Sequence, residues 1–239
     1  MNSLDDIVGF KKRKIYQNRD FFCFSLDSLL LAYYTEIKKN DERILELGVG
    51  NGVNLLILSK KHKQKMIGID IQKESVDLAK KSLKYNKLEK QIEIKEMDIK
   101  GCYKKLGNDC FDVILCNPPY FSKESITKNK VKTNAKSEQL LSLDDVFRES
   151  SKLLKNGGRL YMVYPVTNLE DVLESSRKYN LGVKNIRYVY YNKERSAKIM
   201  LFKACKNAKK GLIVEKPLIL FENGGKTPEY RKIMGEEDD

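Results

Sequence analysis

The residues best suited to chemistry are the stretch Asn117-Pro118-Pro119-Tyr120, which follows an apolar run at residues 113–116. The run predicts a buried strand, and two prolines must end it, because proline lacks an N–H and has a fixed φ. A carboxamide and a phenol are thereby held at the carboxyl end of a strand, where ligands bind in open α/β sheets. Taken alone, the stretch is equally typical of a plain strand-terminating turn.

A second candidate site is the glycine-rich stretch Glu46-Leu47-Gly48-Val49-Gly50-Asn51-Gly52, between a predicted strand and a predicted helix. Glycine is needed where the backbone turns sharply and a ligand approaches closely. The spacing lacks the later glycine of the dinucleotide fingerprint and the Gly-Lys-Ser/Thr of a P-loop, which disfavours a nicotinamide oxidoreductase and a P-loop enzyme. The Glu46 carboxylate suits a cationic ligand better than a pyrophosphate.

Two aspartates end the next two predicted strands. Asp70 lies roughly 20 residues after the glycines, where an acid can bind both ribose hydroxyls. Asp98 can accept a hydrogen bond from an adenine amino group. Each residue also has an ordinary interpretation, Asp70 as a helix N-cap and Asp98 as a solvated loop residue. Together with the glycine turn, however, they present groups suited to an adenosine moiety.

These groups require a sheet that brings successive strand ends to one edge. Strands alternate with helices, which predicts an α/β fold with a mostly parallel seven-stranded sheet, right-handed crossovers and helices on both faces. The last two strands are joined by residues 192–196 and predict an antiparallel C-terminal hairpin. The predicted strands are residues 43–47, 65–69, 91–97, 111–116, 159–164, 183–191 and 197–204. The predicted helices are residues 25–37, 53–60, 73–86, 143–154, 169–179 and 227–234.

The predicted organisation is one main domain with two appendages. Residues 1–20 are expected to form an irregular basic arm, residues 21–205 the domain, and residues 206–239 an extension packed on it. A glycine-based C-cap at residues 155–158 is expected to close the helix before the fifth strand.

The charge balance is strongly basic, with a formal net charge of +13 and a pI near 9.3 over 239 residues. It indicates a polyanionic partner such as nucleic acid, although a mutational bias toward lysine has the same effect. The cysteines form no C-x-x-C pair and His62 is the one histidine, which argues against zinc and disulfides. No apolar run is long enough to span a bilayer. We expect a cytoplasmic monomer without a metal. The cysteines are Cys23, Cys102, Cys110, Cys116 and Cys205.

The strand-end residues and the Asn-Pro-Pro-Tyr stretch resemble class I S-adenosylmethionine-dependent methyltransferases that methylate amino groups. Adenine-N6, guanine-N2 and protein glutamine-N5 enzymes share this signature. Gln17-Asn18 and Phe22-x-Phe24-Ser25-x-Asp27-Ser28 are similar to the N-terminal motif of the bacterial tRNA(Val) adenine-N6 methyltransferase family, and residues 211–235 are similar to its C-terminus. That family modifies the adenosine at position 37, beside the anticodon.

The resemblance implies a Rossmann-like methyltransferase fold, S-adenosylmethionine as cofactor and tRNA as partner. The implied catalytic residues are Asn117, Pro118, Pro119 and Tyr120. The implied cofactor-binding residues are Ser25, Asp27, Glu46, Gly48, Gly50, Gly52, Asp70, Ile71, Asp98, Ile99 and Asn117.

The chemistry is a methyl transfer to an exocyclic amine, whose lone pair is delocalised into the ring. The Asn117 side-chain oxygen and the Pro118 carbonyl can accept its two N–H bonds and favour a pyramidal nitrogen. Positioning and preorganised dipoles then supply most of the acceleration, without a metal or a strong base. Tyr120 is expected to stack on the base, assisted by Phe121.

Three basic clusters are candidates for contact with RNA phosphates, although each cluster alone is also typical of a solvated face. If they bind phosphates, affinity should fall steeply with salt. The clusters are Lys11, Lys12, Arg13 and Lys14; Lys123, Lys128, Lys130, Lys132 and Lys136; and Lys193, Arg195 and Lys198.

Several alternatives remain open. A ribosomal RNA guanine-N2 enzyme shares the signature. A protein glutamine-N5 enzyme is expected to carry an N-terminal helical domain, and a DNA adenine enzyme a target-recognition domain. A non-catalytic nucleic-acid-binding domain of the same fold would be expected to lack Asn117 or Asp70.

Overall fold

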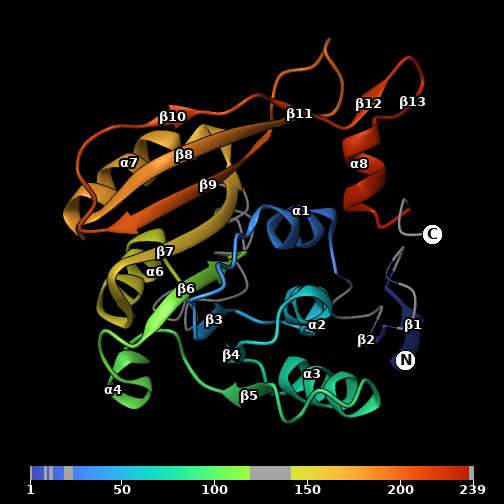
Figure 1. The fold of residues 1–239 in the computed structure, drawn as a ribbon, viewed down its shortest axis with the longest axis vertical. Coiled ribbons are helices and arrows are strands. Elements are labelled where there is room, and N and C mark those ends of the chain that lie inside the picture. The colour runs from blue at the N-terminus through green and yellow to red at the C-terminus, as the bar shows by residue number, and fades with distance from the viewer. Residues whose placement is uncertain (1, 8–9, 11–12, 19–23, 119–140, 237–239) are drawn as a thin grey trace, which may run out of the picture.

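The centre of the fold is a nine-stranded sheet in the order β10-β8-β9-β7-β6-β3-β4-β5, with β11 also paired to β8. A computed structural model describes residues 2–7, 10, 13–18, 24–118 and 141–236 (Figure 1). Strands β3 through β7 are parallel to one another, and β9 runs antiparallel to both β7 and β8. The strands are β3 (Arg43–Leu47), β4 (Lys65–Asp70), β5 (Ile92–Glu96), β6 (Phe111–Cys116), β7 (Leu154–Pro165), β8 (Leu181–Tyr190), β9 (Ile199–Lys206), β10 (Ile213–Val214) and β11 (Leu218–Ile219).

The predicted α/β fold is confirmed. The seven longer strands of this sheet are the seven expected from the sequence, and the two-residue strands β10 and β11 complete the nine. The antiparallel pair is also present, but β9 is inserted between β8 and β7, so that β8 is the outer strand of the pair.

Helices cover both faces of the sheet and bury two separate cores. Side chains of α1, α2, α3 and α8 pack in one core, and those of α6 and α7 pack in the other. Neighbouring residues on one strand enter opposite cores, as Val113 and Ile114 do, because side chains alternate along a strand. The helices are α1 (Leu26–Tyr34), α2 (Val53–Lys61), α3 (Lys73–Tyr85), α4 (Tyr103–Leu106), α6 (Leu143–Leu153), the 3-10 turn η2 (Val166–Asn168), α7 (Leu169–Lys178) and α8 (Pro228–Ile233).

The prediction of an irregular arm at residues 1–20 is wrong for its described part. Strands β1 (Asn2–Asp6) and β2 (Lys14–Asn18) form an antiparallel hairpin. Ile7 and Ile15 are buried in the core below it, at 1% and 0% exposure. The outer edge of β2 is satisfied by α3, because the Tyr16 amide donates to Ser82 Oγ at 2.9 Å. Ile7 and Ile15 are among the few apolar residues of a basic stretch, and the hairpin packs on α3, which is distant in the sequence. No local pattern therefore predicted the hairpin.

Two predicted helix ends also differ from the structure. Helix α1 ends at Tyr34 rather than Ile37. Helix α6 ends without the expected glycine cap, because its C-cap Leu154 is already extended, with φ −71° and ψ 138°. Residues 155–158 instead belong to β7, in a bulge between the pairs Phe111–Leu154 and Val113–Arg159.

The C-terminal segment runs along β8 and ends beside α1 (Figure 1). After β11 come the hairpin strands β12 (Phe221–Glu222) and β13 (Gly225–Lys226), and then α8. Arg187 of β8 forms a bidentate ion pair with Glu229 of α8, with both N–O distances 2.7 Å. Tyr33 of α1 donates to the same carboxylate at 3.2 Å. None of the described helices is both long and apolar enough to cross a bilayer.

Candidate active site

The carboxyl ends of β3, β4, β5 and β6 meet at one edge of the sheet. In the register, Leu47 lies beside Ile69 on one side and Cys116 on the other, and Asp70 lies beside Glu96. The glycine turn, Asp70, Asp98 and Asn117 therefore follow neighbouring strand ends. The sheet brings together groups that the sequence separates widely.

The glycine turn has a left-handed backbone at each of its glycines. The φ angles are 72° at Gly48, 52° at Gly50 and 87° at Gly52, a region that side chains with a Cβ rarely adopt. The Gly50 amide donates to Asp70 Oδ2 at 2.8 Å, which ties the turn to the next strand end. Gly52 is the N-cap residue of α2. The result is a partly buried backbone turn at the start of a helix.

Asp70 organises the second strand end. Besides the Gly50 contact, its Oδ1 accepts from the Gln72 amide at 2.9 Å. Burial raises the pKa of Asp70, although these amide donors act in the opposite direction. The amides of Gly50, Ile71 and Gln72 all act on this carboxylate, which has about four acceptor positions, so room remains for a ligand hydroxyl. The neighbouring Ile71 is 56% exposed and offers an apolar surface beside the carboxylate.

The third strand end is less enclosed. Asp98 is exposed, and its Oδ1 accepts from the Lys100 amide at 2.9 Å. Ile99 is 7% exposed and packs in the core, so it presents little surface to a ligand.

Glu46 lies beneath the glycine turn and is 2% exposed. Its Oε1 accepts from Asn54 Nδ2 at 2.6 Å, and its Oε2 has no hydrogen-bond partner among the described residues. Burial raises the pKa of Glu46 to about 8. A buried carboxyl group with one unpartnered oxygen is costly unless a donor binds it. This oxygen therefore fits a cationic ligand group.

Asn117 is held from the other side by α1. Its Nδ2 donates to Ser28 Oγ at 3.2 Å, and Ser28 is 9% exposed. A carboxamide with its nitrogen toward Ser28 presents its oxygen on the opposite side. Nearby, burial raises the pKa of Asp27, and Ser25 is the N-cap residue of α1. Pro118 is buried, whereas Pro119, Tyr120 and Phe121 lie outside the described residues.

A family model described as a methyltransferase domain matches residues 38–216, which is most of the chain. The chain belongs to this methyltransferase family. Its curated relatives include proteins named tRNA1(Val) (adenine(37)-N6)-methyltransferase. The one from Cytophaga hutchinsonii is 22% identical over 192 residues, 80% of each chain. The one from Trichodesmium erythraeum is 27% identical over 172 residues, 70% of each chain.

Solved structures share the fold at low identity. A predicted O-methyltransferase from Agrobacterium tumefaciens has a TM-score of 0.71 at 21% identity, over 87% of this chain and 95% of its own. A geranyl diphosphate C-methyltransferase from Streptomyces coelicolor, solved with S-adenosyl-L-homocysteine, has a TM-score of 0.56 at 12% identity, over 75% of this chain and 79% of its own.

Three residues that contact the candidate site residues had no role assigned from the sequence. Asn54 and Ser28 hold Glu46 and Asn117 as described above. Gln17 of β2 is 6% exposed, and its Oε1 accepts from the Phe24 amide at 3.1 Å and from Asn51 Nδ2 at 3.5 Å. It thereby links the N-terminal hairpin to the glycine turn. For Gln17 and Ser28, the one signal in the sequence was their place in the motif-like N-terminal stretch.

Some basic residues of the candidate RNA-binding clusters lie within the described part of the methyltransferase, in the N-terminal hairpin and in the β8–β9 loop. Arg13 is half-buried, burial lowers its pKa, and Lys14 lies 3.7 Å from Asp6. Lys193 is ion-paired with Glu222, whereas Arg195 lies over the Tyr191 ring.

For the remaining candidate RNA-binding residues, the described part of the structure gives no side-chain contact. Lys198 is exposed. Lys11, Lys12, Lys123, Lys128, Lys130, Lys132 and Lys136 lie outside the described ranges. Within those ranges, no group of three or more His, Cys, Asp or Glu side chains is placed to hold a metal ion.

Proposed function

We propose that this methyltransferase uses S-adenosylmethionine to methylate N6 of an adenosine in tRNA, at position 37 beside the anticodon of tRNA(Val). The observation that carries the proposal is the placement of Asn117 at the strand end next to the glycine turn, with its amide nitrogen held by Ser28. The names of the curated relatives support the choice of tRNA adenosine.

The strand-end groups fit the cofactor. The backbone of the glycine turn would lie along its methionine part, and Asp70 would bind the ribose hydroxyls. Exposed Ile71 would pack against the adenine, and Asp98 would accept from its amino group. The unpartnered Oε2 of Glu46 would accept from the ammonium group. Ser25 and Asp27, at the start of α1, would close over the methionine end.

When bound, S-adenosylmethionine supplies a methyl group made electrophilic by its sulfonium. Asn117 Oδ1 and the Pro118 carbonyl accept the two N–H bonds of the target amine and turn its lone pair toward that methyl group. The base must leave the stack of the anticodon loop to reach this position. Tyr120 and Phe121 would stack on it. Most of the acceleration then comes from positioning.

The test is incubation of the purified chain with methyl-labelled S-adenosylmethionine and total tRNA, total ribosomal RNA or a protein extract, followed by mass spectrometry. We expect N6-methyladenosine in the tRNA fraction, at position 37 of tRNA(Val). Label in guanosine or glutamine would contradict the proposal and favour the other amino methyltransferases. We further propose that the chain acts as a monomer, which light scattering during gel filtration would check.

A further inference from the structure

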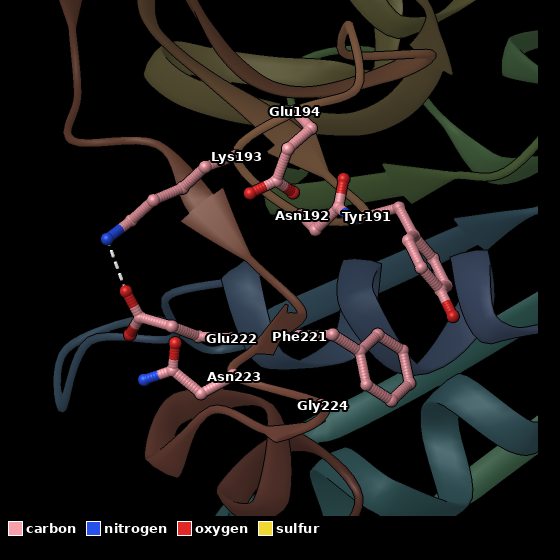
Figure 2. A pocket seen from close by; sticks show the side chains of 8 residues that line it. All are labelled: Tyr191, Asn192, Lys193, Glu194, Phe221, Glu222, Asn223 and Gly224. Carbon is pink, nitrogen blue, oxygen red and sulfur yellow. Dashed lines mark hydrogen bonds and ion pairs between the residues drawn. The ribbon is translucent and has the colours of Figure 1, made fainter.

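An aromatic pocket lies away from the strand ends described above. It has a volume of about 480 Å³ and lies between the β8–β9 loop and the β12–β13 hairpin (Figure 2). Tyr191 and Phe221 form one side, with ring centroids 4.7 Å apart and a tilt of 34°. Lys193 and Glu222 form an ion pair across the other side. The volume is typical of a pocket for one small ligand group.

The pocket is rigidly built. The Leu220 amide donates to the Tyr190 carbonyl at 2.9 Å, and the Phe221 amide to the Tyr191 carbonyl at 2.8 Å. Phe221 is supported from behind by Tyr230, with an edge-on contact of 5.3 Å. Tyr230 is 7% exposed, but Tyr191 is 48% exposed. Tyr191 therefore contributes a partly exposed aromatic ring to a pocket whose other side is fixed by Tyr230.

The polar groups around Tyr191 match a nucleobase. The Arg195 guanidinium lies over the Tyr191 ring, 4.8 Å from its centre, and presents a planar cation on which a base can stack. Asn192, Asn223 and Glu194 line the pocket and offer amide and carboxylate groups for a base edge. Glu222 is neutralised by Lys193, and exposed Lys198 lies at the end of the same loop. A carboxylate at the base edge favours a base with an exocyclic amino group.

The position also suits the substrate. Strand β8 is parallel to β7, so the loop after β8 lies at the same edge of the sheet as Asn117. The Val166 amide, just after β7, donates to the Lys198 carbonyl at 3.0 Å. The ends of β8 and β6 are separated by three strand spacings across the sheet, about 14 Å, and by four residues along the strands, about 13 Å. A few nucleotides of an RNA loop can bridge that gap.

We propose that the Tyr191–Phe221 pocket binds a second unpaired base of the RNA substrate, a few nucleotides from the methylated adenosine. The base stacks on the Arg195 guanidinium that lies over Tyr191, and Asn192 or Glu194 contacts its edge. The inference rests on the proposed function, because it takes RNA as the substrate. It adds a recognition site outside the strand ends that hold the cofactor.

The test measures binding of an RNA hairpin with the sequence of the tRNA(Val) anticodon arm. In Tyr191→Ala we expect the Kd for this RNA to rise about tenfold, because the variant removes the ring that holds Arg195 in place and stacking contributes about this much per base. Tyr191→Phe should bind like the wild type. The affinity for S-adenosylmethionine and the rate at saturating RNA should not change. The matched control is Tyr85→Ala, since Tyr85 is 49% exposed at the end of α3, at the opposite edge of the sheet.

A fluorescent base locates the contact. With 2-aminopurine placed at single loop positions, we expect one position other than the target to be quenched by the wild type and not by Tyr191→Ala. If Tyr191→Ala binds the RNA and quenches the fluorescent base as the wild type does, the proposal that the pocket binds a base is overturned. This holds even if the wild type methylates tRNA. If the wild type methylates no tRNA, the proposed function fails separately, and RNA binding that still depends on Tyr191 supports the pocket. Absence of RNA binding by the wild type overturns both.

Discussion

At the scale of single residues, variants of Asn117 and Ser28 should change the rate of methyl transfer without changing the affinity for the cofactor. Asn117→Ala should slow single-turnover methyl transfer by about 100-fold or more while the affinity for S-adenosylmethionine survives, because the amide positions the target amine. Ser28→Ala should slow transfer about fivefold, since one neutral hydrogen bond contributes about 1 kcal/mol. Single-turnover kinetics and calorimetry would measure the two effects.

The double variant tests whether Ser28 acts through Asn117. If it does, Asn117→Ala with Ser28→Ala should be no slower than Asn117→Ala alone. Ser28→Thr, which keeps the hydroxyl, should recover much of the lost rate. Additive losses would instead indicate that Ser28 supports only the stability of α1.

The raised pKa of Glu46 predicts that cofactor binding depends on pH. Burial raises its pKa from 4.5 to about 8, so the folded protein holds this proton below about pH 8, whereas the unfolded chain releases it near 4.5. The contribution of Glu46 to stability therefore falls as pH rises through this window. A bound ammonium group favours the carboxylate, so cofactor affinity should rise with pH, at most about tenfold per pH unit, and level off above about 8.

Calorimetry at several pH values would measure this dependence. Glu46→Gln should bind the cofactor more weakly and without the pH slope. The control Glu89→Gln changes an exposed residue before β5 and should keep the slope. An unchanged slope in Glu46→Gln would show that another group titrates.

At the scale of elements, the N-terminal hairpin should contribute to the stability of the whole fold. The Ile15 side chain is 0% exposed, so Ile15→Ala should lower the free energy of unfolding by about 2–5 kcal/mol. The matched control is Ile213→Ala, because Ile213 is 63% exposed and should change stability by less than about 0.5 kcal/mol. Urea unfolding followed by circular dichroism would compare the two. Equal effects would show that the hairpin does not pack on α3 in solution.

The hairpin also connects to the site. Gln17 joins β2 to Asn51 of the glycine turn, and its Nε2 donates to Asp5 of β1 at 3.0 Å. A basic N-terminal stretch therefore supports the glycine turn.

At the scale of the whole molecule, the net charge of +13 predicts a strong salt dependence of tRNA binding. The logarithm of the affinity should fall linearly with the logarithm of the salt concentration. Lys198→Ala should weaken binding and make the slope shallower by about one, whereas Lys81→Ala, an exposed residue on α3, should not. Fluorescence anisotropy at several salt concentrations would measure both. A flat response would contradict phosphate contacts as a source of affinity.

We also propose that residues 206–239 are an extension packed on a domain formed by residues 21–205. The pairing of β10 and β11 with β8, and the ion pair of Arg187 with Glu229, support this division. The same packing places Phe221 beside Tyr191.

The sequence by itself determined the seven longer strands of the large sheet, most of the helices between them and the groups at the strand ends, but not the N-terminal hairpin or the short C-terminal strands. This was possible because those signals are local: apolar runs, glycines that need a positive φ, and prolines that end a strand. Parallel strands separated by helices then place Asp70 and Asn117 at one edge of the sheet.

The tertiary structure alone decided which distant side chains complete the site. Ser28 meets Asn117 across 89 residues, and Tyr16 of β2 meets Ser82 across 66. Tyr191 meets Phe221 because the chain returns along β8 after β9. None of these pairs has a periodic or local pattern, since each forms only when separate elements pack together and bury their side chains against one another.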